Sequence, residues 1–280
     1  MNALDEDAAG NLWIATWGDG VTRYQKSDGS FLNIKNSEGG DNLLSDNGTC
    51  DIEVDDLSGD IWVATFAGLD RISSLNDSTF TSRNYSYGNA LESVSGNQIT
   101  CIFEDTEHRI WVGTNNGLNI FNRQKEIFTK LFKHDGLPGN FIKAVIEDDK
   151  GQYWITTEKG LAKLEKSNNG WDITRYEQAD GLQAKEFFVN SAYRASSGEI
   201  LLGGINGFNY FYPDDIQPNP YLPKLQFTGF KLFNEDVTIG GKESPLQSDI
   251  NATEQIVLRH DQSVFSIEYQ GVSFTHPEKN

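Results

Sequence analysis

The chain has 280 residues and a formal net charge of −18 at pH 7, because 41 acidic residues outnumber 23 basic ones. A charge of this size repels the phosphates of nucleic acids and of anionic lipids, so we expect no nucleic acid among its partners and no basic patch for membrane docking. Aromatic residues make up 12% of the chain and glycines number 27, which favours β-strands joined by tight turns.

The sequence shows no targeting or anchoring segment. No run of about 18 apolar residues occurs, as a membrane-spanning helix would need. The first residues, MNALDEDAAGNLW, are acidic and lack the apolar stretch of a signal peptide. From the residues alone we therefore expect a chain without a signal peptide or transmembrane helix.

Four tryptophans mark a sequence repeat. Each opens the pattern W-[IV]-x-T, at Trp13, Trp62, Trp111 and Trp154, and a fifth copy, GEILLGGINGFNYF, has Leu201 in the tryptophan position. Successive copies are 49, 49, 43 and 47 residues apart. A period of about forty to fifty residues with several short strands per unit is typical of a β-propeller blade. The sequence therefore predicts an all-β propeller of about five four-stranded blades.

Each repeat predicts four strands in order. An apolar first strand, such as Asn140–Glu147, precedes a turn such as residues 7–10 or 148–151. In that turn Asp accepts backbone N–H groups and Gly tolerates positive φ. The tryptophan strand is almost wholly apolar, as a strand packed on both faces between stacked blades would be. A glycine hairpin leads to the third strand, and the fourth is predicted near Phe31, Phe80, Phe128 and Ile173.

The composition changes after the predicted propeller, residues 1–212. Residues 213–223 hold four of the seven prolines and are predicted to form a stiff, extended linker. In residues 224–280, the segments KLQFTGFKLF, EQIVLRH and SVFSIEYQGVSF alternate with period two and predict three strands. This region is short for a complete sandwich of about 100 residues, so we expect the start of an immunoglobulin-like β-sandwich.

The strand count favours an incomplete ring. The first unit has only residues 1–7 for its innermost strand, and the fifth enters the linker without a clear fourth strand. We therefore expect part of a larger propeller, an open arc whose unpaired edges would make the isolated chain prone to aggregate.

The sequence offers little catalytic chemistry. It has no P-loop, nucleophile elbow or zinc-protease motif, and we expect no catalytic residue, no metal and no cofactor. Its carboxylates are interpreted as residues of the repeated turns, which are too short for a calcium loop, although spacing alone cannot exclude a glycosidase pair. Two cysteines are too few for a disulfide framework or a four-thiolate zinc site, and spacing does not decide whether they form a bridge. The cysteines are Cys50 and Cys101. The four histidines, which have no partner at metal-ligand spacing, are His108, His134, His260 and His276.

The loops between the second and third strands are the candidate ligand-binding site. In a four-stranded blade they lie on the same face as the blade-to-blade connections, and their tips differ between copies while the framework repeats. Aromatic rings beside amides and charges suit a sugar through stacking and hydrogen bonding, and ordinary loop variation is the alternative explanation. The candidate residues are Trp17, Asp19, Phe66, Asn115, Asn116, Glu158, Lys159 and Asn206.

The repeat, written D-x-x-G-x-L-W-I-x-T-x-x-G-L-x-R-[YF], resembles that of the two-component regulator propeller family. The segment GGINGFNYFYPDDIQPNPYLPKLQFTGFKLFNEDV resembles the last blade and exit linker of such sensors. RHDQSVFSIEYQGVSFTHPEKN resembles the opening of their immunoglobulin-like three-Y domain. The resemblance covers nearly all of the 280 residues.

This resemblance implies a parent protein larger than the chain. Members of the family are membrane-spanning histidine kinases, plain or hybrid, that often control polysaccharide use. Their propellers and three-Y domain lie in the periplasm and their kinase lies in the cytoplasm. The chain is thus expected to be a sensor module that binds a ligand, expected to be a glycan, and relays the signal. The implied partners are that glycan or another small ligand, the remaining blades, the three-Y domain and kinase of the parent chain, and a second copy in a homodimer.

Two other classes of function stay open at this point. A propeller enzyme, such as a lyase resembling the streptogramin-inactivating family, is one alternative. A protein-interaction scaffold is the other. Turnover assays with added metal would separate the enzyme from the sensor and the scaffold.

Overall fold

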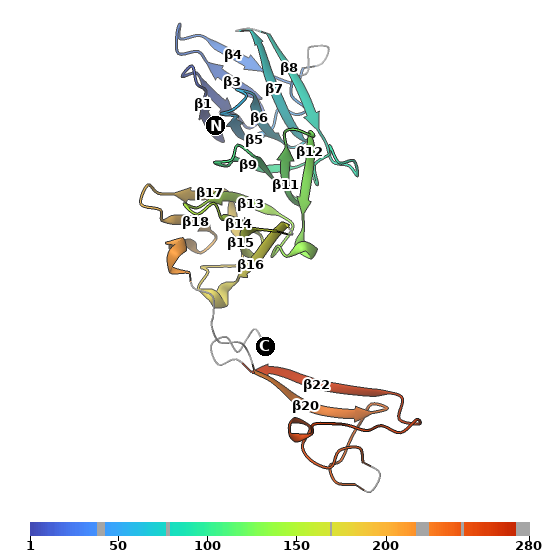
Figure 1. The fold of residues 1–280 in the computed structure, drawn as a ribbon. Coiled ribbons are helices and arrows are strands. Elements are labelled where there is room, and N and C mark those ends of the chain that lie inside the picture. Colours follow the sequence, from blue (N-terminus) through green and yellow to red (C-terminus); the bar gives the residue numbers. More distant parts are fainter. Residues whose placement is uncertain (38–42, 77–78, 169, 217–223, 242–243, 273–280) are drawn as a thin grey trace. The chain divides into compact units, whose positions relative to one another are not determined.

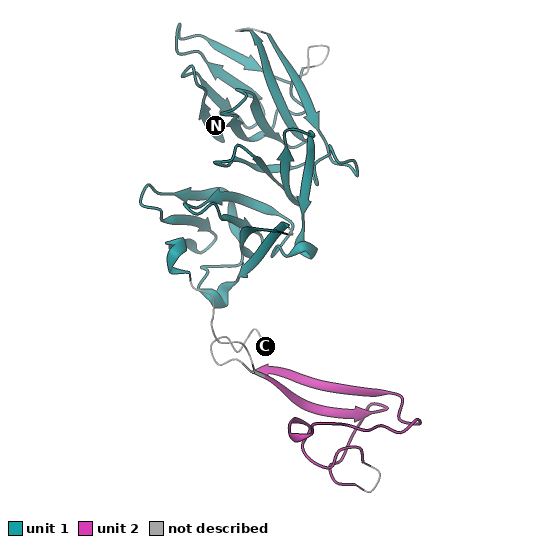
Figure 2. Ribbon diagram, viewed as in Figure 1, with its two compact units in different colours: residues 1–216 teal, residues 217–280 magenta. Residues whose placement is uncertain are grey.

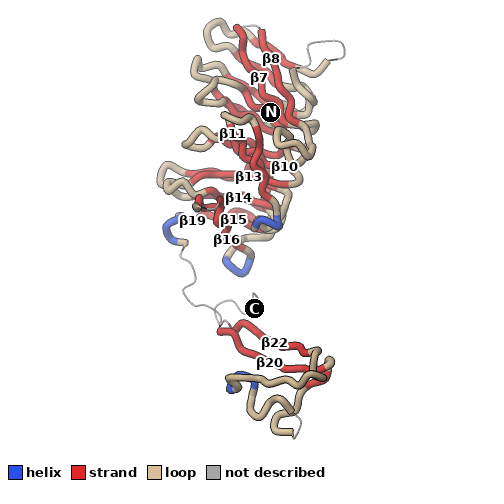
Figure 3. The backbone as a smooth tube through the Cα atoms, turned by 45° about the vertical axis from the view of Figure 1, so that its right-hand side comes forward, coloured by secondary structure: helices blue, strands red, loops and turns tan. Residues whose placement is uncertain are grey.

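The computed structural model describes residues 1–37, 43–76, 79–168, 170–216, 224–241 and 244–272. The chain divides into two compact units, residues 1–216 and 217–280 (Figure 2). Loops and turns join the strands in both units, and the helical segments among the described residues are single turns (Figure 3). Among the described residues, no helix has the length and apolar character needed to cross a membrane.

The first unit consists of five antiparallel sheets, which we call blades 1–5 in chain order (Figure 1). The strands of each blade are neighbours in sequence order, as the repeat predicts. Blade 1 contains β1 (Ala3–Glu6), β2 (Leu12–Ala15), β3 (Val21–Tyr24) and β4 (Phe31–Ile34). Blade 2 contains β5 (Thr49–Val54), β6 (Ile61–Thr65), β7 (Leu69–Asn76) and β8 (Thr79–Tyr85). Blade 3 contains β9 (Ile99–Glu104), β10 (Ile110–Thr114), β11 (Gly117–Asn122) and β12 (Ile127–Leu131).

The last two blades differ in strand number. Blade 4 contains β13 (Ile142–Glu147), β14 (Tyr153–Thr157), β15 (Gly160–Ser167) and β16 (Gly170–Tyr176). Blade 5 has three strands among the described residues: β17 (Phe187–Arg194), β18 (Ile200–Gly204) and β19 (Gly207–Phe211). Single 3₁₀ turns follow blades 3, 4 and 5: η1 (Lys133–Asp135), η2 (Gln178–Asp180) and η3 (Pro213–Asp215). The predicted all-β fold of about five blades is confirmed.

The hydrophobic core lies between successive blades. Four buried clusters fill the interfaces of blades 1 and 2, 2 and 3, 3 and 4, and 4 and 5. The first strands β1, β5, β9, β13 and β17 pack consecutively against one another. Strands β6, β10 and β14 are buried along their whole length, because a blade covers each of their faces.

The repeated tryptophans occupy equivalent buried positions on the second strands of blades 1–4, as predicted. Each indole Nε1 donates a hydrogen bond to the Asp that begins the preceding turn. In blade 3, Trp111 is fully buried and its Nε1 lies 2.7 Å from Asp105 Oδ2. The other Oδ atom of Asp105 accepts the backbone N–H groups of Glu107 and Arg109. The corresponding pairs are Trp13–Asp7, Trp62–Asp55 and Trp154–Asp148.

Blade 5 lacks this pair. Ala195 stands in the Asp position and Leu201 in the Trp position. Leu201 is paired with Tyr193 and Tyr210 across the sheet. Strand β17 also carries an irregularity between Phe187 and Ala192 that shifts its register against β18.

The second unit contains a three-stranded sheet in the order β21-β20-β22. Its strands are β20 (Lys224–Leu232), β21 (Glu235–Asp236) and β22 (Phe265–Val272), and η4 (Ile250–Ala252) is its 3₁₀ turn. The prediction of a strand at EQIVLRH is wrong, because residues 254–260 form no strand; β20 pairs with β22 instead, and an alternating pattern makes a strand only where a partner strand is present. Residues 217–223 of the predicted linker, and residues 273–280 with His276, lie outside the described residues. The three-Y assignment stays a prediction.

Candidate functional site

The tip loops between the second and third strands are fixed by a repeated threonine. In blade 3, Thr114 Oγ1 donates to Gly117 O at 3.0 Å and accepts from Asn116 N at 3.0 Å. Gly117 has φ +122°, and a Cβ there would approach the Phe132 ring to 2.9 Å, so the hairpin requires glycine. The same bond to the glycine carbonyl is made by Thr16, Thr65 and Thr157.

Several predicted polar tip residues bond to the loop that connects two blades. Glu158 Oε2 accepts from Phe141 N at 3.0 Å, while Glu158 N donates to Phe141 O. Asn116 Nδ2 donates to Ser95 O at 3.2 Å. Asn206 Nδ2 donates to Gln183 O at 3.4 Å, and its backbone N donates to Gln183 Oε1 at 2.8 Å. These contacts place the tips on the same face as the connecting loops and give these side chains a structural role.

Two predicted residues from neighbouring blades do come together. The Trp17 and Phe66 rings meet edge to face, with centroids 5.1 Å apart. Trp17 forms a β-bridge with Gly48, and a Cβ on Gly48 would lie 2.6 Å from the Phe66 ring. Glycine at 48 therefore lets the two rings approach each other. Trp17 is 71% exposed, so a large aromatic surface faces solvent from a fixed position.

The remaining predicted tip residues are exposed and separate. Asp19 forms an ion pair with Lys35 at 2.7 Å. Asn115 and Lys159 are exposed, and their backbone N–H groups donate to Gln98 O and Thr157 Oγ1 respectively. Within the described ranges, the structure thus brings Trp17 and Phe66 into contact, while Asn116, Glu158 and Asn206 bond to connecting loops.

The sequence interpretation missed a group of carboxylates at the axis of the propeller. A cavity of about 360 Å³ is lined by residues of all five first strands, among them Asp51 and Asn190. Asp51 Oδ2 accepts from Ile102 N at 2.8 Å and also bonds to the side chain of Asn190. Burial raises the pKa of Asp51 to about 7, although these hydrogen bonds lower it in part.

Two neighbouring carboxylates make the same kind of bond, each to a backbone N–H group of the next blade's first strand. Asp5 Oδ2 accepts from Val54 N at 2.6 Å, and Glu53 Oε1 accepts from Glu104 N at 3.1 Å. Burial and the charge of Asp5 raise the pKa of Glu53 to about 9. These carboxylates satisfy N–H groups on the free edge of the next blade's first strand.

The interpretation that the carboxylates occupy turn positions is therefore wrong for three of them. Asp51 and Glu53 stand two residues apart on β5, and Asp5 occupies the matching region of β1. The signal was their period-two spacing inside a strand, which places both on one face. The sequence does not reveal that this face turns toward the axis.

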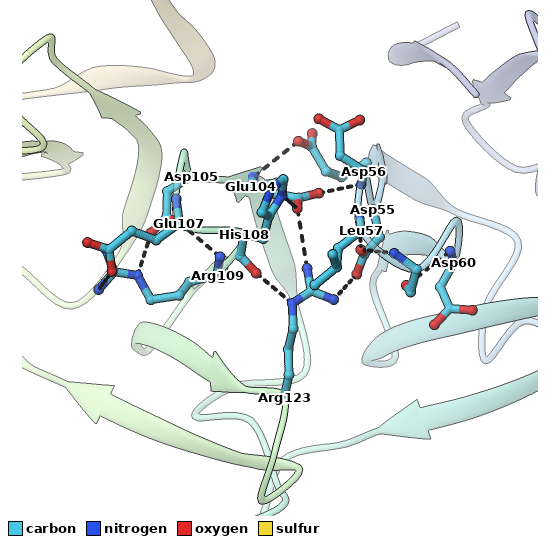
Figure 4. Close-up of polar contacts among 12 residues, drawn as sticks. Asp55, Asp56, Leu57, Asp60, Glu104, Asp105, Glu107, His108, Arg109 and Arg123 are labelled. Atoms are coloured by element: carbon cyan, nitrogen blue, oxygen red, sulfur yellow. Dashed lines mark hydrogen bonds and ion pairs between the residues drawn. The ribbon is translucent and has the colours of Figure 1, made fainter. Parts of the chain in front are cut away.

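At the end of the blades opposite the tip loops, an ion-pair network joins blades 2 and 3 (Figure 4). Arg123 pairs with Asp55 of blade 2 and, at 3.3 Å, with Glu104 Oε1. Glu104 in turn bonds to His108 Nδ1 at 2.7 Å and to Asp56 N at 2.8 Å. Burial alone would raise the pKa of Asp55, but the bond from Arg123 helps bring that pKa below its usual range.

Metal and disulfide chemistry find no support in the described part of the chain. It holds no group of three or more His, Cys, Asp or Glu residues arranged for a metal ion. Cys50 and Cys101 are both free thiols. His134 stacks on Phe132 with ring centroids 5.2 Å apart.

Sequence comparison identifies the repeats. Residues 93–116 and 136–159 match the family described as "Two component regulator propeller". The matched stretches lie in blades 3 and 4, so these two blades are similar to two-component regulator propeller repeats.

Relatives with this organisation are much longer proteins. Histidine kinase P4 of Formosa agariphila is 29% identical over 273 residues, which cover 96% of this chain and 19% of the kinase. The extracellular domain assigned to the hybrid two component system BT3049 of B. thetaiotaomicron superimposes with a TM-score of 0.68 at 21% identity. That match covers 96% of this chain and 35% of the domain.

A propeller enzyme shows a more distant likeness. The virginiamycin B lyase of Staphylococcus aureus, solved with quinupristin, superimposes with a TM-score of 0.53 at 14% identity. The match covers 76% of this chain and 70% of the lyase chain. This likeness concerns the fold alone.

Proposed function

We propose that this chain is part of the extracytoplasmic sensor region of a two-component histidine kinase. In the parent protein the propeller would lie in the periplasm, bind a glycan and pass the signal to the kinase. The observation that carries the proposal is the alignment of 96% of the chain with a histidine kinase. The chain spans about a fifth of that kinase, so the remaining blades, the rest of a three-Y domain and the kinase are proposed partners within the parent chain, and a second copy is a proposed partner in a homodimer.

The proposed ligand site is the tip face around Trp17 and Phe66. The Trp17 ring is held by Phe66 and by the bridge to Gly48 while most of its surface is exposed. A ring that is already ordered loses little conformational entropy on binding. Its apolar face suits the C–H face of a sugar, and the exposed side chains of Asn115 and Lys159 offer hydrogen bonds to hydroxyls.

Glycan binding by the full 280-residue chain tests this proposal. An array of neutral and acidic oligosaccharides should give at least one ligand, and calorimetry should then measure its affinity. Trp17→Ala should weaken binding about tenfold or more, because it removes the platform, while single alanine variants at Phe66, Asn115, Glu158 and Asn206 should have smaller effects.

Phe31→Ala is the matched control. Phe31 is 70% exposed in the same blade but lies on the fourth strand, away from the tips. It should leave the affinity unchanged. Unchanged affinity in all five tip variants would move the site elsewhere, and the absence of any glycan ligand would contradict the proposal.

A further inference from the structure

A second cavity lies between blades 3 and 4, at the end of the blades opposite the tip loops. Its volume is about 390 Å³, and its lining includes Ile120, Gln124, Thr129 and Trp171. We propose that this cavity, the rim groove, is a separate binding site for an uncharged sugar ring. The proposal stands whether or not the tip face binds a glycan.

Unequal hairpins build the rim groove. In blade 4, β15 and β16 pair over seven residue pairs, ending at Lys166 with Trp171 and Ser167 with Gly170. In blade 3, β11 and β12 pair over five, ending at Asn122. The two extra pairs carry Trp171 toward blade 3, where its ring meets Trp111 at a centroid distance of 5.2 Å. The shorter hairpin of blade 3 leaves space beside that ring.

Two apolar side chains line the cavity: the Trp171 ring forms its wall and Ile120 forms its floor. Trp171 is half-buried, and the Arg109 guanidinium lies 5.7 Å from its ring centroid, which fixes the indole. Ile120 is buried and is directly paired with Thr129 across the sheet, so both face blade 4. A fixed indole beside an aliphatic floor can pack against the C–H face of a pyranose ring.

The charges around the groove are already compensated within the protein. Arg109 pairs with Asp105 at 2.7 Å and with Glu107 at 3.1 Å. Arg123 pairs with Asp55 and Glu104. An anionic ligand would have to compete with buried carboxylates for these guanidinium groups, so the groove favours an uncharged ligand.

Uncharged polar groups remain available at the rim. The side chains of Gln124 and Thr129 make no hydrogen bond in the part of the chain that the structure describes, although both line the groove. The side-chain oxygen of Asn122 accepts from Lys125 N, which leaves its amide N–H₂ free to donate. Amide and hydroxyl groups around an apolar floor are the pattern that binds sugar hydroxyls.

Saturation-transfer NMR and calorimetry on the 280-residue chain test the rim groove. The probes are the methyl pyranosides of glucose, mannose and galactose, with glucuronate as the charged comparison. At least one neutral glycoside should bind with a Kd of about 1 mM, and glucuronate should bind more weakly. Trp171→Ala should weaken binding about tenfold.

Two further variants separate this site from the tip face and from a folding defect. Thr129→Trp fills the groove from an exposed strand position without removing a core contact, and it should abolish binding while the thermal melt is retained. Phe31→Ala, which changes an exposed aromatic residue of blade 1 outside both proposed sites, should leave monosaccharide binding unchanged. Binding that survives both Thr129→Trp and Trp171→Ala, the absence of binding by every neutral glycoside, or tighter binding of glucuronate would overturn the proposal. If Trp17→Ala alone no longer binds the oligosaccharides found on the array, that result would concern the tip face and not the rim groove.

Discussion

Blades 1–4 and blade 5 share the antiparallel order of their first three strands but differ in the contacts that stabilise them. In blade 3, Asp105, Trp111 and Thr114 form a connected framework that holds the turn, the second strand and the tip hairpin. In blade 5, the corresponding residues are alanine, leucine and Gly204. All three positions differ together, which indicates that they act as one unit: the indole N–H is one of the donors that compensate the burial of the carboxylate.

Blade 5 is held mainly by its contact with blade 4. Phe211 packs on Trp154 with ring centroids 4.8 Å apart, and Arg194 pairs with Asp149 at 2.7 Å. Its other face exposes Tyr193, Phe208 and Tyr210. In blades 1–4 the corresponding face is covered by the next blade. The comparison suggests that the framework stabilises a blade from within, whereas blade 5 depends on its neighbour.

The largest expected effect tests the framework directly. Trp111→Ala should lower the free energy of unfolding by about 3–5 kcal/mol, because it opens a cavity in the core and leaves the Asp105 carboxylate without its indole donor. The matched change in blade 5, Leu201→Ala, should cost about 1–2 kcal/mol, since Leu201 is only half-buried. Urea unfolding of the two variants measures both values.

If Trp111→Ala and Leu201→Ala lower the free energy of unfolding equally, the distinction between blade 5 and the other blades is contradicted. A loss under about 1 kcal/mol for Trp111→Ala would contradict the framework itself. The conservative variant Trp111→Phe keeps most of the volume but not the N–H group. It should fall between the wild type and Trp111→Ala, and so separates the packing effect from the hydrogen bond.

The sequence predicted the features that recur in every repeat. It did not predict features that depend on how neighbouring blades are arranged. The tryptophan period fixed the blade order and the buried second strands. The turn aspartates were predicted to accept backbone N–H groups, but their bond to the indole depends on the folded turn. The contact of Trp17 with Phe66 could not be predicted, because it joins residues of two blades. The orientation of Asp51 toward the axis could not be predicted either, since alternation does not say which face is inside.

The carboxylates at the axis of the propeller give a pH-dependent test of how blade 2 is stabilised. Asp51 and Glu53 have folded pKa values of about 7 and about 9, above the values near 4 of an unfolded chain. The folded state therefore binds these protons more tightly, and their contribution is fully present below about pH 4 and lost as the pH rises through the folded pKa values. We expect stability to fall by at least about 2 kcal/mol between about pH 5 and pH 9.

Glu53→Gln is the variant that checks the origin of this slope. It removes the group with the higher pKa while keeping an acceptor for Glu104 N. Denaturation curves across the same pH range should show a flatter dependence. The turn carboxylates Asp55 and Asp105 have lowered pKa values, so their contribution is lost only as the pH falls to acid values and does not interfere. An unchanged slope in Glu53→Gln would contradict the assignment.

The smallest expected effect concerns the link from blade 5 to blade 2. Asn190 has φ +52°, lies in the irregular part of β17 and bonds to Asp51 at the axial cavity that both residues line. Asn190→Ala should cost about 1 kcal/mol, the value of a typical side-chain hydrogen bond. Because that bond favours the ionised carboxylate, its loss should also raise the pKa of Asp51, which NMR titration of the carboxyl can follow. A shift downward, or none, would place the stabilising contact elsewhere.

The indole–carboxylate pairs also make blades 1–4 separately observable. Each buried Nε1–H is held by a carboxylate of its own blade, so it can exchange with deuterated water only when that blade opens. The four indole protons resonate well apart from backbone amides, and their exchange rates would report local opening free energies blade by blade. Blade 5, with leucine in this position, gives no such signal. Its opening would be read from Trp154, the one of these four indoles that blade 5 covers.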